Sequence, residues 1–316
     1  MLKRSRLSAA LFPLAVSISA LMLVAACGGA AATPAVTPAA TAAPTGDDPT
    51  PVAATASPTV MAGIVHLTGP TDLVLRYDVA GGFVPPEFFA AHVPAFTLYG
   101  DGTVVFVDNN TPLPQRQDNI GVASPLRTTK LAEADIQALL EFALRDSGLA
   151  LAKTQYDNQM VADAPSTIFT VNAEGDSKTV SAYALGMDAG PGTVPADAAI
   201  LKALGGLADR LSNFGTTVSS QPYTPAAYRA VILEQSGITG VVIRDWPWID
   251  PQPSDFATPA DPNALQQGTH VLQSLDLSAL GIDGVQNGIY GGLWVKATGG
   301  KVYSLVIRPL LPDEKA

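Results

Sequence analysis

A low-complexity segment near the N-terminus limits where this 316-residue chain can fold. The segment from Gly28 to Val60 consists almost wholly of Ala, Thr, Pro and Val, and Asp47 and Asp48 are its only charged residues. Because it has no aromatic residue and no apolar periodicity, it cannot bury enough surface to offset the chain entropy lost on folding. Its prolines favour extended structure of about 3.1 Å per residue, which predicts a tether of at most about 100 Å. A folded body is therefore expected from about Ile64 onward.

The residues before this tether have the layout of a secretory signal. Lys3, Arg4 and Arg6 precede an apolar run from Leu7 to Leu23, and small residues follow the run. A charged start, an apolar middle and a small-residue end are the three parts that a signal peptidase recognises.

The end of the apolar run carries a more specific pattern. Val24-Ala25-Ala26-Cys27 resembles the cleavage motif of bacterial lipoproteins, with Val24 where that family most often has Leu. The resemblance implies a signal peptide at 1–26, cleavage before Cys27, and a lipid on its thiol that anchors the tether at 27–62. An uncleaved membrane helix is the alternative, since the run approaches the length of about 20 residues that spans a bilayer. Both interpretations place the body outside the cytoplasm, and the first places it on the outer face of the cell membrane.

Composition excludes several classes of function. Loss of the three signal-peptide cations would change the formal charge from −10 to −13, which disfavours nucleic-acid binding because phosphates are neutralised by Lys and Arg. Cys27 is the only cysteine, so no disulfide and no thiolate metal site is expected. The three histidines, His66, His92 and His270, share no motif. We expect no metal, no cofactor and no nucleic-acid partner.

The first folded block, 63–216, alternates strand and helix patterns. It predicts a strand followed by a glycine pair, two hairpins, and two amphipathic helices. In order, these are Leu73–Tyr77, Phe96–Tyr99 with Thr103–Val107, Ala132–Ser147, Ser166–Val171 with Thr179–Tyr183, and Ala196–Phe214. A polar loop is expected at Asp108–Arg127. This order favours an α+β fold, in which an antiparallel sheet carries helices packed on one face.

The second block, 217–316, is predicted to be mostly β. Its expected strands are Tyr228–Leu233, Gly240–Arg244, and a closing hairpin of Leu293–Ala297 with Lys301–Arg308. The prolines of Arg308–Pro312 are expected to end the ordered chain. Whether the two blocks form one domain or two is left open by the pattern.

A search for chemistry finds no catalytic motif. There is no Gly-x-Ser-x-Gly, no His-Glu-x-x-His, no Walker loop and no dinucleotide fingerprint. A glycosidase-type pair of carboxylates stays open, because two carboxylates can meet from anywhere in a chain. Aspartates in the loop Trp246–Asn263, with Asp276 and Asp283, could bind calcium, but they lack its spacing and are better explained as solvated loop charge.

Two features are candidates for binding. Gly81 and Gly82 could turn the chain so that Phe83 stands at a loop tip, although burial statistics favour Phe83 folding into the core. Trp246 and Trp248 could form an aromatic surface for a peptide or sugar, although two tryptophans covering a small core are favoured.

The Gly81-Gly82-Phe83 motif, followed by a further strand, a helix, a hairpin and an amphipathic segment, resembles emfourin, a family of small bacterial inhibitors of thermolysin-like metalloproteases. The match uses Leu131–Leu144, Ile168–Tyr183 and Ile200–Leu211 and covers the first block only. It implies contact with a protease at Gly81–Phe83. The C-terminal Arg308–Glu314 also resembles the end of uncharacterised lipoproteins of high-Ala, high-Pro bacteria, which implies no activity.

These observations predict a lipid-anchored lipoprotein that binds a protein without catalysis, with protease inhibition as its specific form. The alternative is a lipoprotein that binds a cell-wall polymer or carbohydrate through Trp246 and Trp248. The third interpretation is a hydrolase that uses a pair of carboxylates.

Overall fold

The computed structural model of the protein describes residues 63–113, 116–188, 193–258 and 267–315. These residues belong to a single compact unit of the chain, Val60–Ala316. Cys27 lies outside the described residues, so cleavage, lipidation and the tether stay predictions. None of the described helices is both long enough and apolar enough to cross a bilayer.

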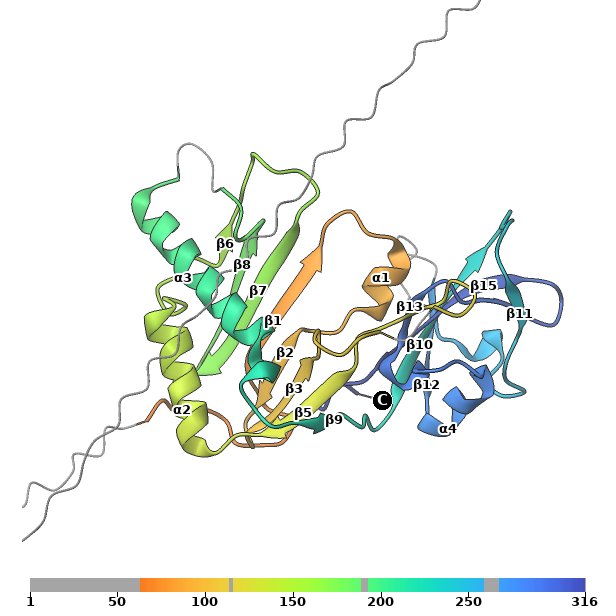
Figure 1. Cartoon of the computed structure of the whole chain (residues 1–316), viewed down its shortest axis with the longest axis horizontal. Coiled ribbons are helices and arrows are strands. Elements are labelled where there is room, and N and C mark those ends of the chain that lie inside the picture. Colours follow the sequence, from red (N-terminus) through yellow and green to blue (C-terminus); the bar gives the residue numbers. More distant parts are fainter. Residues whose placement is uncertain (1–62, 114–115, 189–192, 259–266, 316) are drawn as a thin grey trace, which may run out of the picture. The chain divides into compact units, whose positions relative to one another are not determined.

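The strands of the first block form a twisted sheet (Figure 1). Its strand order is β6-β8-β7-β1-β2-β3-β5-β9, antiparallel except where β6 runs parallel to β8. The strands are β1 (Leu73–Gly81), β2 (Phe96–Tyr99), β3 (Thr103–Val107), β5 (Leu126–Lys130), β6 (Gln155–Tyr156), β7 (Pro165–Ala173), β8 (Asp176–Tyr183) and β9 (Gln221–Pro222).

Both predicted hairpins of this sheet are confirmed. In the first, β2 pairs with β3 across the turn that contains Gly102 (φ +86°). In the second, β7 pairs with β8 around Glu174 and Gly175, whose φ values are 56° and 80°. Two successive residues with positive φ make the primed turn that matches the twist of an antiparallel pair.

Two helices contribute to the core of this sheet. The helix α2 (Glu133–Glu141) continues as the π-helical turn η1 (Phe142–Asp146), and α3 (Pro195–Ser212) continues as the 3₁₀ turn η2 (Phe214–Thr216). Their predicted apolar stripes are buried with alternate residues of the central strands, in one cluster that includes Ile136, Leu139, Leu140, Leu204, Leu207, Leu211, Leu75, Phe96, Phe106, Phe169 and Val180. Each such buried side chain stabilises the fold by about 1.5–3 kcal/mol.

The second block forms another sheet, to which the first block adds one short strand, β4 (Gly121–Val122). Five of its strands have the order β11-β14-β15-β10-β12, and β13 joins β15 to β4. They are β10 (Tyr228–Gln235), β11 (Ile243–Asp245), β12 (Gln267–Leu272), β13 (Ile289–Gly291), β14 (Trp294–Lys296) and β15 (Val302–Pro309). Short helical segments accompany them: α4 (Ser274–Leu277), η3 (Pro253–Asp255), η4 (Ser278–Leu280) and η5 (Val285–Asn287).

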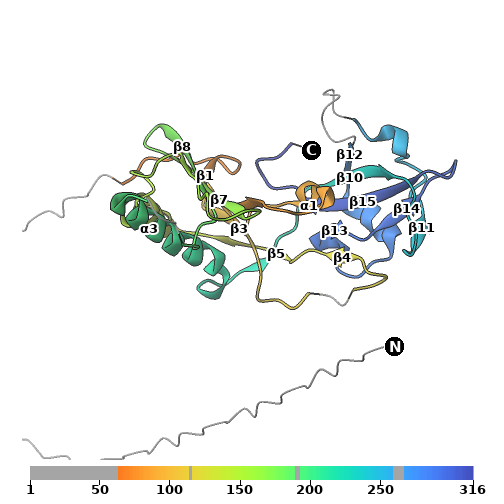
Figure 2. The ribbon, with the colours of Figure 1, turned by 90° about the horizontal axis from the view of Figure 1, so that it is seen from above.

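The central strands of the second sheet are covered on both faces. One side of β10 and β15, with Ile232 and Leu305, packs into the main core of this sheet. Residues on the other side, including Val231 and Val306, form a small cluster against Ala90 of α1 (Pro86–Ala91). Burial on both faces explains why the middles of these strands, Ala230–Leu233 and Leu305–Ile307, are continuous apolar runs rather than alternating ones. The helix α1 lies beside β15 in both views of the ribbon (Figures 1 and 2).

The two mostly antiparallel sheets with few helices confirm the α+β class in its broad form. Three local predictions were wrong. The expected loop Asp108–Arg127 contains β4 and the first residues of β5, because Leu126 and its neighbours pair with β3. The expected strand Gly240–Arg244 is shortened to β11, because only Ile243–Asp245 pairs with β14.

The third error concerns the C-terminal residues, which continue the fold rather than end it. Leu310 and Leu311 are buried, and Leu311 packs with Tyr99 and Val105 of the first sheet. The Tyr223 hydroxyl donates a hydrogen bond of 2.8 Å to the Leu310 carbonyl. Proline prevents a helix here, but it does not prevent an extended segment whose side chains are apolar.

Candidate functional site: the loop and helix around Phe83

The first candidate residues from the sequence form the exit from β1. Gly81 and Gly82 have φ values of +87° and +83°, a conformation that side chains disfavour. They turn the chain away from the sheet after the last β1–β7 pair, Gly81 with Pro165. Phe83 is consequently 91% exposed. The preferred interpretation of the sequence, in which Phe83 folds into the core, was wrong, because the glycine turn directs the ring into solvent.

The helix α1, which follows Phe83, exposes apolar side chains to solvent. Phe88 is 45% exposed and Phe89 is 50% exposed, and α1 has no fully buried residue. In the described part of the chain, the exposed phenylalanines are Phe83, Phe88 and Phe89 alone. Exposed rings scattered singly over a surface are ordinary, but their concentration in one short segment is typical of an interaction site.

An apolar hollow of about 360 Å³ lies beside α1. Most of its lining is contributed by apolar side chains, and Leu113 at its margin is 49% exposed. The lining residues are Phe88, Ala91, His92, Val93, Val107, Leu113, Ala123, Ser124, Leu126, Asn287 and Tyr290. One wall is fixed by an edge-to-face contact of Phe88 with Tyr290, whose ring centroids are 6.0 Å apart. The hollow is large enough to receive one apolar side chain of a partner.

A hydrogen bond between two side chains holds the far end of α1. Nε2 of His92 lies 2.5 Å from Oδ1 of Asp78, and both side chains are largely buried. Asp78 is on β1, so the chain that leaves the sheet at Gly81 returns to it at His92. Because both ends of the segment that contains α1 are fixed to the sheet, the helix would lose little conformational entropy when it binds a partner. The pair could not be predicted from the sequence, because the two residues follow no local motif.

A His–Asp pair is also part of the Ser-His-Asp catalytic triad. A serine nucleophile needs a hydrogen bond to the second ring nitrogen of the histidine. Ser124 lines the hollow with His92, but it makes no hydrogen bond to His92 among the described residues. What the described contacts of the pair do show is that it joins the end of α1 to β1.

The second candidate from the sequence, the tryptophan pair, lies in the core of the second sheet. Trp248 is only 7% exposed, and its indole N–H donates to the carbonyl of Asp276 at 2.9 Å. Trp246 donates to the Pro251 carbonyl at 2.9 Å and makes edge-to-face contacts with Trp248, Phe256 and Tyr303. A sugar stacks on an open ring face, and here the rings contact one another instead. The geometry therefore agrees with the favoured interpretation of the pair as core residues.

Aspartates near this pair have local structural partners. Asp255 and Asp276 accept hydrogen bonds of 2.7 Å from the backbone amides of Gln252 and Gln273, which caps short helical turns. In the described ranges, no group of three or more His, Cys, Asp or Glu side chains could hold a metal ion. Part of the Asp-rich loop, residues 259–263, lies outside those ranges.

Comparison with known proteins identifies no relative of this chain. No protein-family model, no curated protein and no solved structure matches the chain. The resemblance to emfourin at Gly81–Phe83 thus stays a prediction, as does the resemblance to bacterial lipoproteins at Cys27.

Proposed function

We propose that this protein is a lipid-anchored lipoprotein whose folded body binds another protein, without catalysis, through Phe83 and the exposed side of α1. The observation that carries the proposal is the concentration of all the exposed phenylalanines of the described residues in 83–89. Phe83 lies on an exposed loop and can insert into a partner, and the hollow beside α1 can bind a side chain of that partner. A few aromatic anchors and the pockets they fill supply most of the energy of a protein interface.

The anchoring part of the proposal rests on Cys27 and the signal-like residues before it. It is tested by cell fractionation with labelled palmitate. The natural chain is expected in the membrane fraction with label, whereas Cys27→Ser is expected without label. Label that persists in Cys27→Ser would contradict acylation at this residue.

The binding part is tested by photo-crosslinking in the native cell. A benzoylphenylalanine placed at position 83 should crosslink a defined protein, because an exposed side chain in an interface lies within reach of the partner. The matched control is the same group at Ile249, which is 96% exposed but belongs to the second block. Equal products at both positions, or none at position 83, would contradict the proposed surface.

The specific form of the proposal is inhibition of a thermolysin-like metalloprotease, and it is supported by the resemblance at Gly81–Phe83. Addition of the full chain should slow cleavage of a peptide substrate by such an enzyme. Phe83→Ala should remove the effect, while the circular dichroism spectrum stays unchanged. Inhibition that is undiminished in Phe83→Ala would remove this residue from the site.

A further inference from the structure

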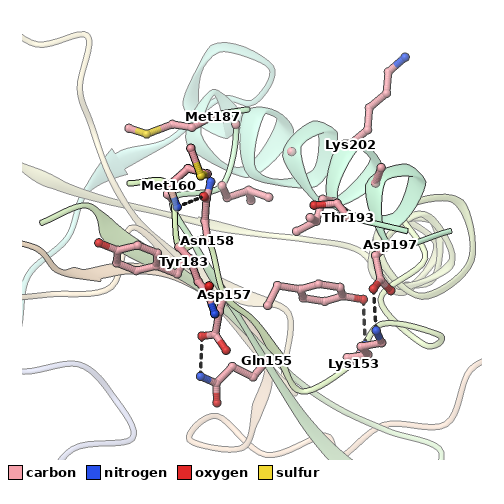
Figure 3. A pocket seen from close by; sticks show the side chains of 18 of the residues that line it. Lys153, Gln155, Asp157, Asn158, Met160, Tyr183, Met187, Thr193, Asp197 and Lys202 are labelled. Carbon is pink, nitrogen blue, oxygen red and sulfur yellow. Dashed lines mark hydrogen bonds and ion pairs between the residues drawn. The ribbon is translucent and has the colours of Figure 1, made fainter. Parts of the chain in front are cut away.

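A second hollow, of about 890 Å³, lies between α3 and the edge of the first sheet (Figure 3). One wall consists of β6 and the residues that follow it, and the other is a face of α3. Gln155, Asp157 and Met160 belong to the first wall, and Leu201 and Gly205 belong to the second. None of the binding residues described above lines this hollow.

The wall formed by α3 is long and contains glycines that the fold does not require. Residues four apart on the helix line it, from Asp197 through Leu201 and Gly205 to Asp209. At about 1.5 Å per residue this face is about 18 Å long. Gly205 and Gly206 lie within the helix, yet a Cβ at either position would meet nothing within 4 Å. Each glycine costs about 1 kcal/mol relative to alanine, and neither packing nor backbone conformation explains the pair. Their effect is to keep the groove open along the helix backbone.

The opposite wall offers an unpaired strand edge. Among the described residues, β6 is the last strand of its sheet and pairs with β8 alone. The Thr154 carbonyl accepts from the Ser181 amide, and the parallel register Gln155–Ser181 directs the Tyr156 backbone toward β8. Because successive residues of a strand alternate in direction, the backbone groups of Gln155 and Asp157 face away from β8. They are directed to the open edge of the sheet.

The two ends of the groove differ in character. At one end, Nζ of Lys153 lies 2.6 Å from Oδ2 of Asp197 (Figure 3). At the other end of the view lie Met160 and Met187, which are 68% and 53% exposed. Methionine side chains adapt their shape to different apolar partners. This end can therefore receive an aliphatic side chain of variable shape.

We propose that the groove between β6 and α3 binds an extended peptide segment, which adds as a further strand to the edge of β6. The main chain of the peptide pairs with the open edge at Gln155 and Asp157. An aliphatic side chain of the peptide lies against Met160 and Met187. This is a binding activity separate from the surface around Phe83.

Length and charge both favour this occupant. A groove of about 18 Å accommodates about five extended residues at about 3.3 Å each. An edge strand facing a helix supplies main-chain hydrogen bonds on one side and side-chain contacts on the other, as strand addition requires. The lining has two lysines against three aspartates, and the whole chain has a formal charge of −10. The peptide is therefore neutral or basic rather than acidic.

The test is selection from a phage-displayed library of random peptides of about seven residues, with the full chain as bait. Enriched peptides are then synthesised with and without N-methyl groups on alternate amides. Strand addition predicts that N-methylation weakens binding at least about tenfold, since each blocked amide removes an inter-strand hydrogen bond. It also predicts slower hydrogen exchange at the Gln155 and Asp157 amides when the unmodified peptide is bound.

A pair of helix variants locates the site. Gly205→Leu fills the groove and should abolish binding, whereas Ala199→Leu, on an exposed part of α3 outside the groove, should leave it unchanged. Circular dichroism establishes that both variants keep their helix content. The proposal is overturned if no peptide is enriched over the Gly205→Leu chain, or if the N-methylated peptides bind as well as their parents. Because Phe83 is outside the groove, Phe83→Ala should leave peptide binding unchanged whether or not it affects the other surface.

Discussion

The carboxylate of Asp313 lies 2.8 Å from the guanidinium of Arg76, across 237 positions of sequence. The Tyr99 hydroxyl, which is completely buried, donates a second hydrogen bond of 2.7 Å to the same carboxylate. Burial and this neighbouring charge raise the pKa of Tyr99 far above its ordinary value, so the hydroxyl keeps its proton. The last residues of the chain therefore hold the first strands of its first sheet.

We expect Asp313→Ala to destabilise the folded body by about 2–4 kcal/mol. The change leaves the buried Tyr99 hydroxyl without its acceptor and the Arg76 guanidinium without its counter-ion. Urea denaturation measures the difference, and Asp283→Ala provides an exposed aspartate as control. Equal stability of Asp313→Ala and Asp283→Ala would show that the Asp313 carboxylate does not contribute to the stability of the fold.

The neighbouring Glu314 predicts a dependence of stability on pH. Burial alone would raise its pKa, but hydrogen bonds from the Arg308 side chain and the Leu311 amide outweigh burial and lower the pKa below its ordinary value of 4.5. A carboxyl whose pKa is lower in the folded state stabilises the fold above its unfolded pKa. That stabilisation is lost as the pH falls through the folded value.

Glu314→Gln tests this dependence. The variant should be less stable than the natural chain at about pH 7, and the difference should shrink as the pH falls below 4.5 and through the lowered pKa of Glu314. The free energy of unfolding, measured by urea denaturation across that range, gives the result. A difference that stays constant with pH would mean that the Glu314 charge does not contribute.

Truncation should affect stability very differently at an exposed and at a buried phenylalanine. Phe83→Ala should change the free energy of unfolding by no more than about 0.5 kcal/mol, because its ring is exposed. Phe169→Ala should cost about 3–5 kcal/mol, because the ring is fully buried and stacks on Tyr77 at 5.5 Å. Thermal unfolding compares the two variants. A large loss in Phe83→Ala would mean that the ring supports the fold and is not reserved for a partner.

The sequence could predict elements whose signals are local. Gly102 and Gly175 permit the positive φ that their turns need, so both hairpins were found. The spacing of Leu204, Leu207 and Leu211 likewise identified the buried face of α3.

Features that depend on distant partners were missed. β5 contains Arg-Thr-Thr-Lys and has little apolar periodicity, and its pairing with β3 makes it a strand. α1 is short, and its position depends on the His92–Asp78 pair and on a cluster in the second sheet. Gly205 is visible in the sequence as an unfavourable helix residue, but only the structure shows that it borders an open groove.

We expect Trp248→Ala to lower the free energy of unfolding by about 3–5 kcal/mol, because a large buried ring is replaced by a cavity.

The carbohydrate alternative makes a different prediction, in which cell-wall polysaccharide quenches tryptophan fluorescence. From the packing of Trp246 and Trp248 against each other we expect no quenching across a panel of sugars. Quenching that disappears in Trp246→Phe would support the alternative.

Substitution of Gly205 tests whether this glycine stabilises the fold or only keeps the groove beside it open. Gly205→Ala should raise the free energy of unfolding by about 0.5–1 kcal/mol, because alanine has the higher helix propensity and its Cβ meets no atom within 4 Å. Gly148→Ala is the matched contrast, since Gly148 has φ +68° and an added Cβ would lie 2.8 Å from Ile200 Cδ1. That variant should be destabilised by at least about 1 kcal/mol. Urea denaturation of the two variants measures whether each change raises or lowers the free energy of unfolding. A loss of stability in Gly205→Ala would mean that the glycine serves the fold, and the reason for inferring a ligand beside it would be removed.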